Sequence, residues 1–302
     1  MIPYRYGELI SQGQEQSSVR AQVRAGQLTL VRHGGYVAGE IAPRPEERHL
    51  ALLRTTVPVL DEASVLSHGT AGLLWGLPVP GRLLTKVHTT RQGNSGGTVG
   101  RWLHSHRAGL SSADLAERDG LVVTSLPRTV VDLCCLSRDN EALMVMDAAA
   151  RILGGVEEVQ KELAGAARRK GVGVARWAVH HASPLAESPG ESLSRYWMII
   201  SGIDQPELQH EVRDDSGALL ARADFAWPAR RLLGEFDGRI KYEGDLVAEG
   251  MSAADVIMAE KRRENRLRAA GWWIIRWLWS DLQDGHAFVR RLVGALDRNP
   301  PR

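Results

Sequence analysis

Apolar and polar positions alternate with different spacings in three successive parts of the chain. In residues 1–60, a helical spacing over about 15–24 ends near Gly26, and two short alternating segments follow, QLTLVR and GYVAG, joined by the turn HGG. Glycine is a common stop after a helix, and a glycine turn between alternating segments is typical of a β-hairpin. We therefore expect a helix followed by a two-stranded hairpin in this part.

Residues 61–183 mix both spacings. ASVLSHGTAGLLWGLPVP predicts a helix, LLTKVHTT and GRWLHSHR predict strands, and three helical segments follow, PRTVVDLCCL, EALMVMDAAARIL and VEEVQKELAGAARRK. His104 and His106 lie on one side of the second strand, a spacing that allows a shared metal ion. Because no third ligand is evident, we interpret them instead as polar residues that face solvent.

Residues 184–302 predict one helix, three strands, a long helix, another strand and a closing helix. This order is typical of an α/β sandwich built around a mixed sheet. The whole chain is therefore expected to be α/β: an N-terminal winged helix, a mixed α+β middle region and a C-terminal α/β sandwich.

The helix and hairpin of residues 1–60 resemble the end of a winged helix-turn-helix, a module that binds DNA. Arg20, Arg24, Arg32 and His33 are the candidates for contact with phosphates and a DNA groove. The alternative is a helix and hairpin that pack on a neighbouring part or bind a protein.

Three carboxylates fall together in ADFAWPARRLLGEFD. A short turn that pairs Trp227 with Leu232 sets Asp224 opposite Glu235, with their Cβ atoms about 5 Å apart. Asp237, two residues further on, points to the same face as Glu235. Opposed carboxylates repel, so protonation, a basic side chain or a divalent cation must compensate them.

Oxygen ligands of this kind suit Mg²⁺, with Mn²⁺ as an alternative, and a carboxylate-held ion beside a basic surface is suited to phosphodiester hydrolysis. The basic segment 260–277 offers Arg263 and Arg266 as phosphate contacts. The alternatives are a solvated helix face for that segment, and neutralisation of the carboxylates by Arg222 and Arg230.

Asp224, the run EFDG at 235–238 and the helix AEKRRENRLRAAGWWIIRW resemble the restriction-endonuclease-like PD-(D/E)XK superfamily, and within it the very-short-patch-repair-endonuclease-like branch (DUF559). That resemblance covers about 185–285. The earlier regions resemble actinobacterial AbiEi-type antitoxins, chiefly through the helix-hairpin and the segment SHGTAGLLWGLPVP. The implied domains are a winged helix over 1–60, an AbiEi-like middle domain over 61–183 and an endonuclease-like domain over 184–302.

The resemblance implies that Asp224 and Glu235 bind metal together with Glu191 from the first helix of the domain. It places Asp237 where the superfamily has its catalytic lysine, and Lys241 and Lys261 are the available substitutes. Glu191 also fits a capping box with Ser188, an alternative that the spacing leaves open.

The net charge of +2 favours no particular partner. The adjacent Cys134 and Cys135 exclude a disulfide framework. No apolar run has the length of a membrane span and no signal peptide is recognised, so we expect a cytoplasmic protein with no membrane partner.

Two functions lead the interpretation of the sequence, and a third, an enzyme that acts on RNA, also stays open. The first is a DNA-binding protein with a magnesium-dependent endonuclease domain. The second is a non-catalytic antitoxin or transcriptional repressor that uses the nuclease-like fold for binding to DNA or to a cognate toxin.

Overall fold

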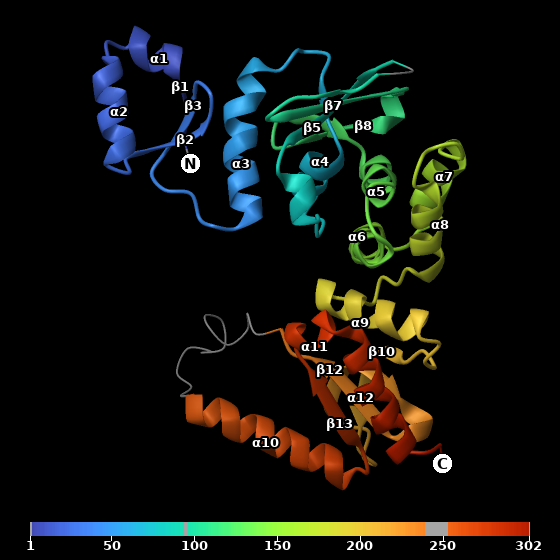
Figure 1. The fold of residues 1–302 in the computed structure, drawn as a ribbon. Helices are drawn as coiled ribbons and strands as arrows, with labels where there is room; N and C mark the ends of the chain where they lie inside the picture. The colour runs from blue at the N-terminus through green and yellow to red at the C-terminus, as the bar shows by residue number, and fades with distance from the viewer. Residues whose placement is uncertain (1, 94–95, 239–252, 302) are drawn as a thin grey trace. The chain divides into compact units, whose positions relative to one another are not determined.

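The protein is a mixed α/β chain, seen in a computed structural model that describes residues 2–93, 96–238 and 253–301 (Figure 1). These ranges contain three β-sheets and twelve α-helices, which confirms the α/β class. Across them, no helix has both the length and the apolar character needed to cross a bilayer.

The chain divides into two compact units. The first comprises Met1–Val145 and Val156–His180, and the second comprises Met146–Gly155 and His181–Arg302. The first unit therefore holds both the predicted helix-hairpin and most of the middle region.

The first unit begins with a small antiparallel sheet in the order β1-β3-β2. Its elements are β1 (Pro3–Arg5), α1 (Tyr6–Ser11), α2 (Gln16–Arg24), β2 (Leu28–Arg32) and β3 (Gly35–Ala38). Leu9, Val19 and Leu28 bury a small apolar core between the helices and the sheet. The predicted helix is α2 and the predicted hairpin is β2–β3. Gly26 follows α2 with a φ of 71°, a backbone conformation that glycine adopts without strain.

Helix α3 (Pro45–Thr56) joins this small sheet to the rest of the first unit. It packs against β1, β2 and β3 and also against the helix α4 and the strand β5 of the next sheet. The helix-hairpin is therefore held to the unit through α3.

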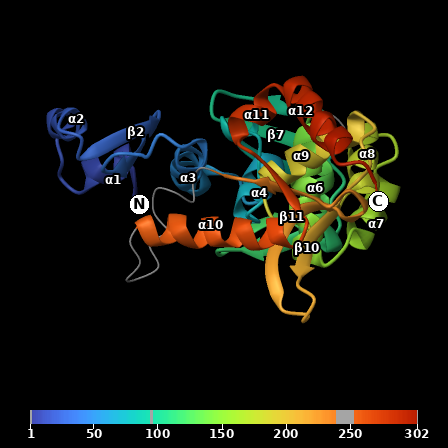
Figure 2. The same cartoon turned by 90° about the horizontal axis from the view of Figure 1, so that it is seen from below.

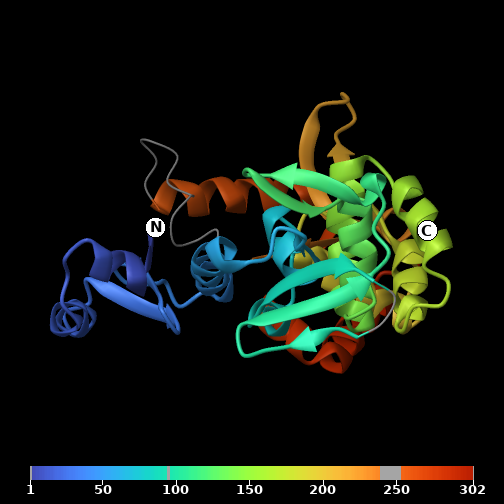
Figure 3. The same cartoon turned by 90° about the horizontal axis from the view of Figure 1, so that it is seen from above.

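The second sheet of the first unit has six strands in the order β6-β7-β5-β4-β9-β8. The strands are β4 (Val65–Leu66), β5 (Val87–Gln92), β6 (Thr98–Val99), β7 (Leu103–Ala108), β8 (Leu115–Arg118) and β9 (Leu121–Thr124). Strands β5 and β7 run parallel, as do β4 and β9, and the other neighbours are antiparallel. These strands are the teal and green arrows of Figure 3.

The helices of the first unit after this point are α4 (His68–Leu74), α5 (Leu126–Cys134), α7 (Glu157–Gly165) and α8 (Val172–His181). Helix α6 (Asp139–Leu153) is divided between the two units. The predicted helix of SHGTAGLL is α4, whereas the residues just before it form the short strand β4. Leu66, Ala71, Val87 and Val123 belong to the core between α4 and the strands.

The second unit is built on a four-stranded mixed sheet in the order β10-β11-β12-β13. Its elements are α9 (Pro189–Ile200), β10 (Glu207–Arg213), β11 (Leu219–Trp227), β12 (Leu232–Phe236), α10 (Ala253–Ala269), β13 (Trp273–Trp277), α11 (Trp279–Gln283) and α12 (Gly285–Arg298). Strand β11 pairs with β12 in the predicted register, with Trp227 opposite Leu232. Strand β13 is parallel to β12.

Helices cover both faces of this sheet. One core gathers Met198 of α9, Leu292 of α12 and Trp277 of β13. The other core includes Leu267 of α10 with Leu233 of the sheet, and Figure 2 shows α10 running along that side. The predicted order of helix, three strands, helix and strand is thus confirmed, and the closing helix is divided into α11 and α12.

Candidate functional site

Asp224 and Glu235 lie on the neighbouring strands β11 and β12. The last ladder pair that joins these strands is Phe225 with Gly234, one residue short of Asp224 and Glu235. The Asp224 Oδ2 atom accepts a hydrogen bond of 2.8 Å from the backbone N–H of Phe236. This carboxylate therefore already binds the neighbouring strand.

Glu235 is held by two guanidinium groups. The Arg263 Nη2 atom of α10 donates to both Glu235 oxygens at 2.9 Å, and the Arg276 Nε atom of β13 donates to Oε2 at 2.8 Å. The parallel register places Arg276 directly beside Glu235. A basic side chain, one of the three expected forms of compensation, is therefore present at Glu235.

The ion pairs extend along α10. Arg263 and Arg276 both bind Glu260, Arg276 reaches Glu264 at 3.4 Å, and Arg268 pairs with Glu264. The hydrogen bond from Arg263 lowers the pKa of Glu260, and the same bond, together with Glu235, raises the pKa of Arg263. Glu260 and Arg263 therefore stay charged at neutral pH.

The two arginines expected to neutralise the carboxylates have other partners. Arg222 pairs with Glu187 at 2.8 Å, and Arg230 donates to the carbonyl oxygen of Leu296 at 3.0 Å. Arg222 and Arg230 are therefore not the residues that neutralise Glu235. Arg263 of α10 and Arg276 of β13 are.

Ser188 caps α9 as the spacing allowed, but the Glu191 carboxylate binds the Ser188 hydroxyl and the Glu187 backbone N–H rather than the Ser188 backbone N–H of a capping box. The backbone N–H of Glu191 donates to the Ser188 Oγ at 3.2 Å, and the Glu191 carboxylate accepts from that hydroxyl at 2.7 Å. The backbone N–H of Glu187 and the Gln209 Nε2 atom each donate to its other oxygen at 2.9 Å. The buried carboxylate therefore fastens the start of α9.

The three predicted magnesium ligands do not converge in the structure. Among the described residues, Glu191, Asp224 and Glu235 do not bring three oxygens within 4.8 Å of one another. The magnesium site therefore remains a prediction.

The other predicted catalytic and phosphate-binding residues are dispersed. Asp237 follows the end of β12, and its backbone N–H donates to the carbonyl oxygen of Trp277 at 2.8 Å. Lys261 and Arg266 are exposed on α10, and Lys241 lies outside the described residues. Arg263, a predicted phosphate contact, is the residue that binds Glu235.

The predicted DNA contacts of the first unit fall into two kinds. Arg20 and Arg24 are exposed on α2. Arg32 instead donates from Nε to the Thr55 carbonyl at 3.0 Å and from Nη1 to the His33 carbonyl at 3.0 Å. Burial, with a smaller contribution from Arg5, lowers the pKa of Arg32. Arg32 thus ties the hairpin to α3, and His33 is exposed at the turn.

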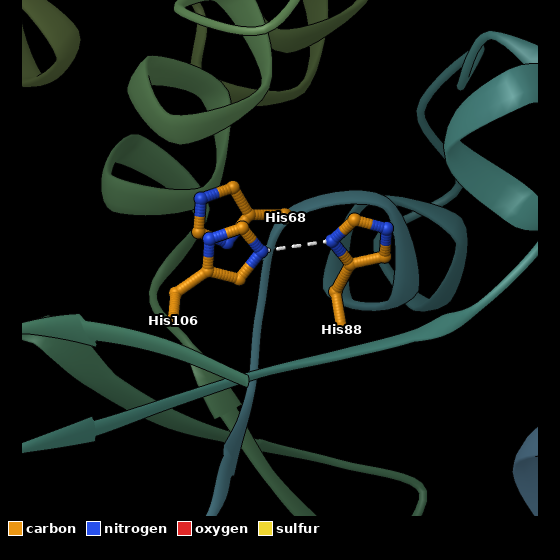
Figure 4. A group of neighbouring side chains, drawn as sticks. All are labelled: His68, His88 and His106. Carbon is orange, nitrogen blue, oxygen red and sulfur yellow. Dashed lines mark hydrogen bonds between the residues drawn. The ribbon is translucent and has the colours of Figure 1, made fainter. Parts of the chain in front are cut away.

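The interpretation of His104 and His106 as polar residues that face solvent is wrong, because both belong to a partly buried group of histidines in the first unit. His106 of β7 lies beside His88 of β5 and His68 at the start of α4 (Figure 4). The ring of His104, also on β7, stacks on that of His106 with centroids 3.9 Å apart. Nitrogen atoms of His68, His88 and His106 lie within 4.8 Å of one another. Both further histidines stand in segments that the sequence singled out: His88 is in the predicted strand LLTKVHTT, and His68 is the second residue of SHGTAGLL. Only the pairing of the strands in the sheet brings them together.

Burial is the main cause of low pKa values in this group. Burial and the nearby His68 lower the pKa of His88 to about 2, and burial and His104 lower that of His106 to about 4. Burial also holds the pKa of His68 well below its usual range. The three imidazoles are therefore neutral at pH 7.

Comparison with known proteins finds similar proteins, but none with a described activity. No protein-family model matches the chain. It is 29% identical over 280 residues to the uncharacterized proteins MT2308 and Rv2248 of two Mycobacterium tuberculosis strains, covering 92% of this chain and 95% of each relative. The crystal structure of the RV2827C protein from Mycobacterium tuberculosis matches with 13% identity and a TM-score of 0.39, over 71% of this chain and 84% of that one. A likeness at that score does not establish a shared fold.

Proposed function

We propose that the protein binds duplex DNA through α2 and acts as a regulator that does not cut the DNA. In this proposal α1, α2 and the β2–β3 hairpin form a winged helix-turn-helix, with α2 as the helix that enters the major groove. The element order supports it: two short helices precede a hairpin whose sheet is completed by β1.

The exposed face of α2 carries the proposal. Arg20 and Arg24 are four residues apart, so they lie on the same side of the helix, and both are exposed. The helix from Gln16 to Arg24 contains no acidic residue. Between Gln16 and Arg24, the other exposed side chains, those of Ser17, Ser18 and Ala21, are short. Short side chains let a helix approach base edges closely, and arginines without acidic neighbours attract phosphates.

The surface between α2 and the β2–β3 hairpin also supports DNA binding. A hollow there is lined by Arg20, Arg24, Leu30 and Tyr36, among other residues. A concave surface with two arginines at its side suits a DNA backbone that passes between the helix and the wing. The bonds from Arg32 to Thr55 keep the wing fixed, which lowers the entropy lost on binding.

The arginines at Glu235 favour regulation over hydrolysis. Arg263 and Arg276 already compensate the charge of this carboxylate, and each hydrogen bond from a guanidinium to a carboxylate is charge-assisted. A metal ion at Glu235 would have to displace both. We therefore assign the second unit a binding or structural role in this proposal.

Equilibrium binding of a labelled duplex tests the proposal. Replacing Arg20 and Arg24 with Ala should weaken binding at least about tenfold, because two phosphate contacts are lost. The matched control is Arg168→Ala with Arg176→Ala, which removes the same charge from exposed positions elsewhere in the first unit. Equal affinity of the two double variants would refute the role of α2.

Metal-dependent hydrolysis is the second candidate function, and it is favoured by the position of Asp224, whose carboxylate binds the backbone N–H of Phe236, the residue after Glu235. Incubation of supercoiled DNA with the protein in Mg²⁺, Mn²⁺ or EDTA separates the two candidates. We expect no metal-dependent cleavage by the wild type. Cleavage that disappears in Glu235→Ala would establish the hydrolase, and cleavage by Arg263→Gln alone would mean that the arginine blocks the metal.

A further inference from the structure

We propose that His68, His88 and His106 form a binding site for a divalent transition metal ion of the Zn²⁺ class. The site is separate from both the predicted magnesium site and the proposed DNA surface. The ligands come from three elements: the start of α4, the strand β5 and the strand β7 (Figure 4).

The distances between the ring nitrogens fit such an ion. The His88 Nδ1 and His106 Nε2 atoms lie 3.0 Å apart, and one ring nitrogen of each histidine lies within 4.8 Å of the other two. Two nitrogens that bind one tetrahedral zinc ion at about 2.0–2.1 Å are about 3.3 Å apart. An ion between His88 and His106 would therefore separate them by only a few tenths of an ångström and replace the proton that they share.

The backbone around the site is firmly held. In the parallel register His88 stands beside His104 and Thr90 beside His106, so these side chains share one face of the sheet. The backbone N–H of His88 donates to the Thr70 hydroxyl at 2.8 Å. The paired strands β5 and β7 carry two of the ligands, which limits their movement on binding.

His68 has an unusual backbone conformation and a fixed ring nitrogen. Its φ of 48° lies in the left-handed region, which is strained for residues other than glycine. Such strained backbone conformations are concentrated at functional sites. Its Nδ1 atom lies 2.9 Å from the Ser67 hydroxyl, which leaves Nε2 as the ligand atom. In metal sites, a hydrogen bond to the ring nitrogen that does not bind the metal orients the imidazole.

One ring must turn when the ion binds. The ring of His68 stacks on that of His106, with centroids 3.7 Å apart and planes 14° from parallel. Stacked rings do not aim their lone pairs at one point, so His68 would swing out of the stack. His88 and His106 already face each other and need only a change of tautomer.

The ligand type selects the metal class. Three neutral imidazoles suit Zn²⁺, Co²⁺, Ni²⁺ and Cu²⁺, whereas Mg²⁺ prefers oxygen ligands. Three protein ligands leave a fourth position for water, the pattern of zinc sites that remain open to a further ligand. Without an ion, the same three rings would be a neutral hydrogen-bonded part of the core.

Calorimetric titration of the EDTA-treated full chain with Zn²⁺ distinguishes these two states. We expect one Zn²⁺ per chain, with affinity reduced about 100-fold or more in His88→Gln and in His106→Gln. His286→Gln, which removes an exposed histidine of the second unit, should bind like the wild type. Absence of saturable binding by the wild type, or unchanged binding by both site variants, would overturn the proposal.

A spectroscopic measurement on the wild type covers the case in which the variants fail to fold. Co²⁺ bound by three imidazoles and water in a tetrahedral site gives intense visible absorption, and Zn²⁺ should remove it stoichiometrically. A spectrum identical to that of Co²⁺ in buffer would refute the site, and Mg²⁺ should not compete in either experiment.

Discussion

Glu235 and Arg276 stand side by side on the parallel strands β12 and β13, joined by a hydrogen bond of 2.8 Å from Nε to the carboxylate. Arg263 binds the same carboxylate from α10. One of the carboxylates that the sequence predicted as a metal ligand is therefore bound by cations that belong to the protein itself.

Replacement of Arg263 by Gln should destabilise the protein by about 1–2 kcal/mol, because it leaves the half-buried Glu235 and Glu260 with one guanidinium fewer. Urea unfolding monitored by circular dichroism measures the change. Arg262→Gln, an exposed neighbour on the same helix, is the control and should change stability by less than about 0.5 kcal/mol. Equal losses in both variants would mean that the ion pairs contribute nothing specific.

Replacement of Asp224 by Ala removes the acceptor for the Phe236 N–H and should lower the unfolding free energy by about 1–2 kcal/mol. Asp224→Asn retains an acceptor oxygen and should lose less. If arginines rather than Mg²⁺ compensate the carboxylates, the melting temperatures of wild type and variant will differ by the same amount with Mg²⁺ and with EDTA. A stabilisation by Mg²⁺ that vanishes in Asp224→Ala would instead support a metal site.

Acid should destabilise the first unit through its buried histidines. His49 lies 2.8 Å from the Leu84 carbonyl and 3.0 Å from the Thr70 hydroxyl, and burial lowers its pKa. The unfolded chain then takes up the proton more readily than the folded chain. The stabilising contribution is complete above the unfolded pKa, about 6.5, and is lost as the pH falls below it.

Urea unfolding at about pH 7.5 and about pH 5.5 tests this assignment. The loss of stability on acidification should be smaller in His49→Gln than in the wild type, by up to about 1.4 kcal/mol per pH unit for one proton. The other buried histidines contribute to both proteins and cancel in the comparison. His33→Gln, which removes an exposed histidine, should leave the acid dependence as it is in the wild type.

Local patterns in the sequence were sufficient for several elements. The spacing over about 15–24 predicted α2, and the turn after Trp227 predicted the register of β11 and β12. Both depend on residues close together in the chain, where turn chemistry and alternation decide the structure. The capping of α9 by Ser188 is local in the same sense.

Contacts between distant segments could not be predicted in this way. Arg276 reaches Glu235 only because β13 returns parallel to β12 after α10, and nothing in the spacing fixes that register. Likewise, His88 and His106 meet through the parallel pairing of β5 with β7. The sequence indicated polar alternation in both strands but not that the strands are neighbours.

The salt dependence of duplex binding tests the central claim, that α2 contacts the DNA backbone through Arg20 and Arg24. The measurement is the slope of log K against log salt concentration for the wild type and for the double Ala variant. We expect the slope to be smaller in magnitude by about 2 in the variant, because two phosphate contacts no longer release counterions. Identical slopes and affinities in the two proteins would contradict the claim and would place any DNA contact elsewhere on the chain.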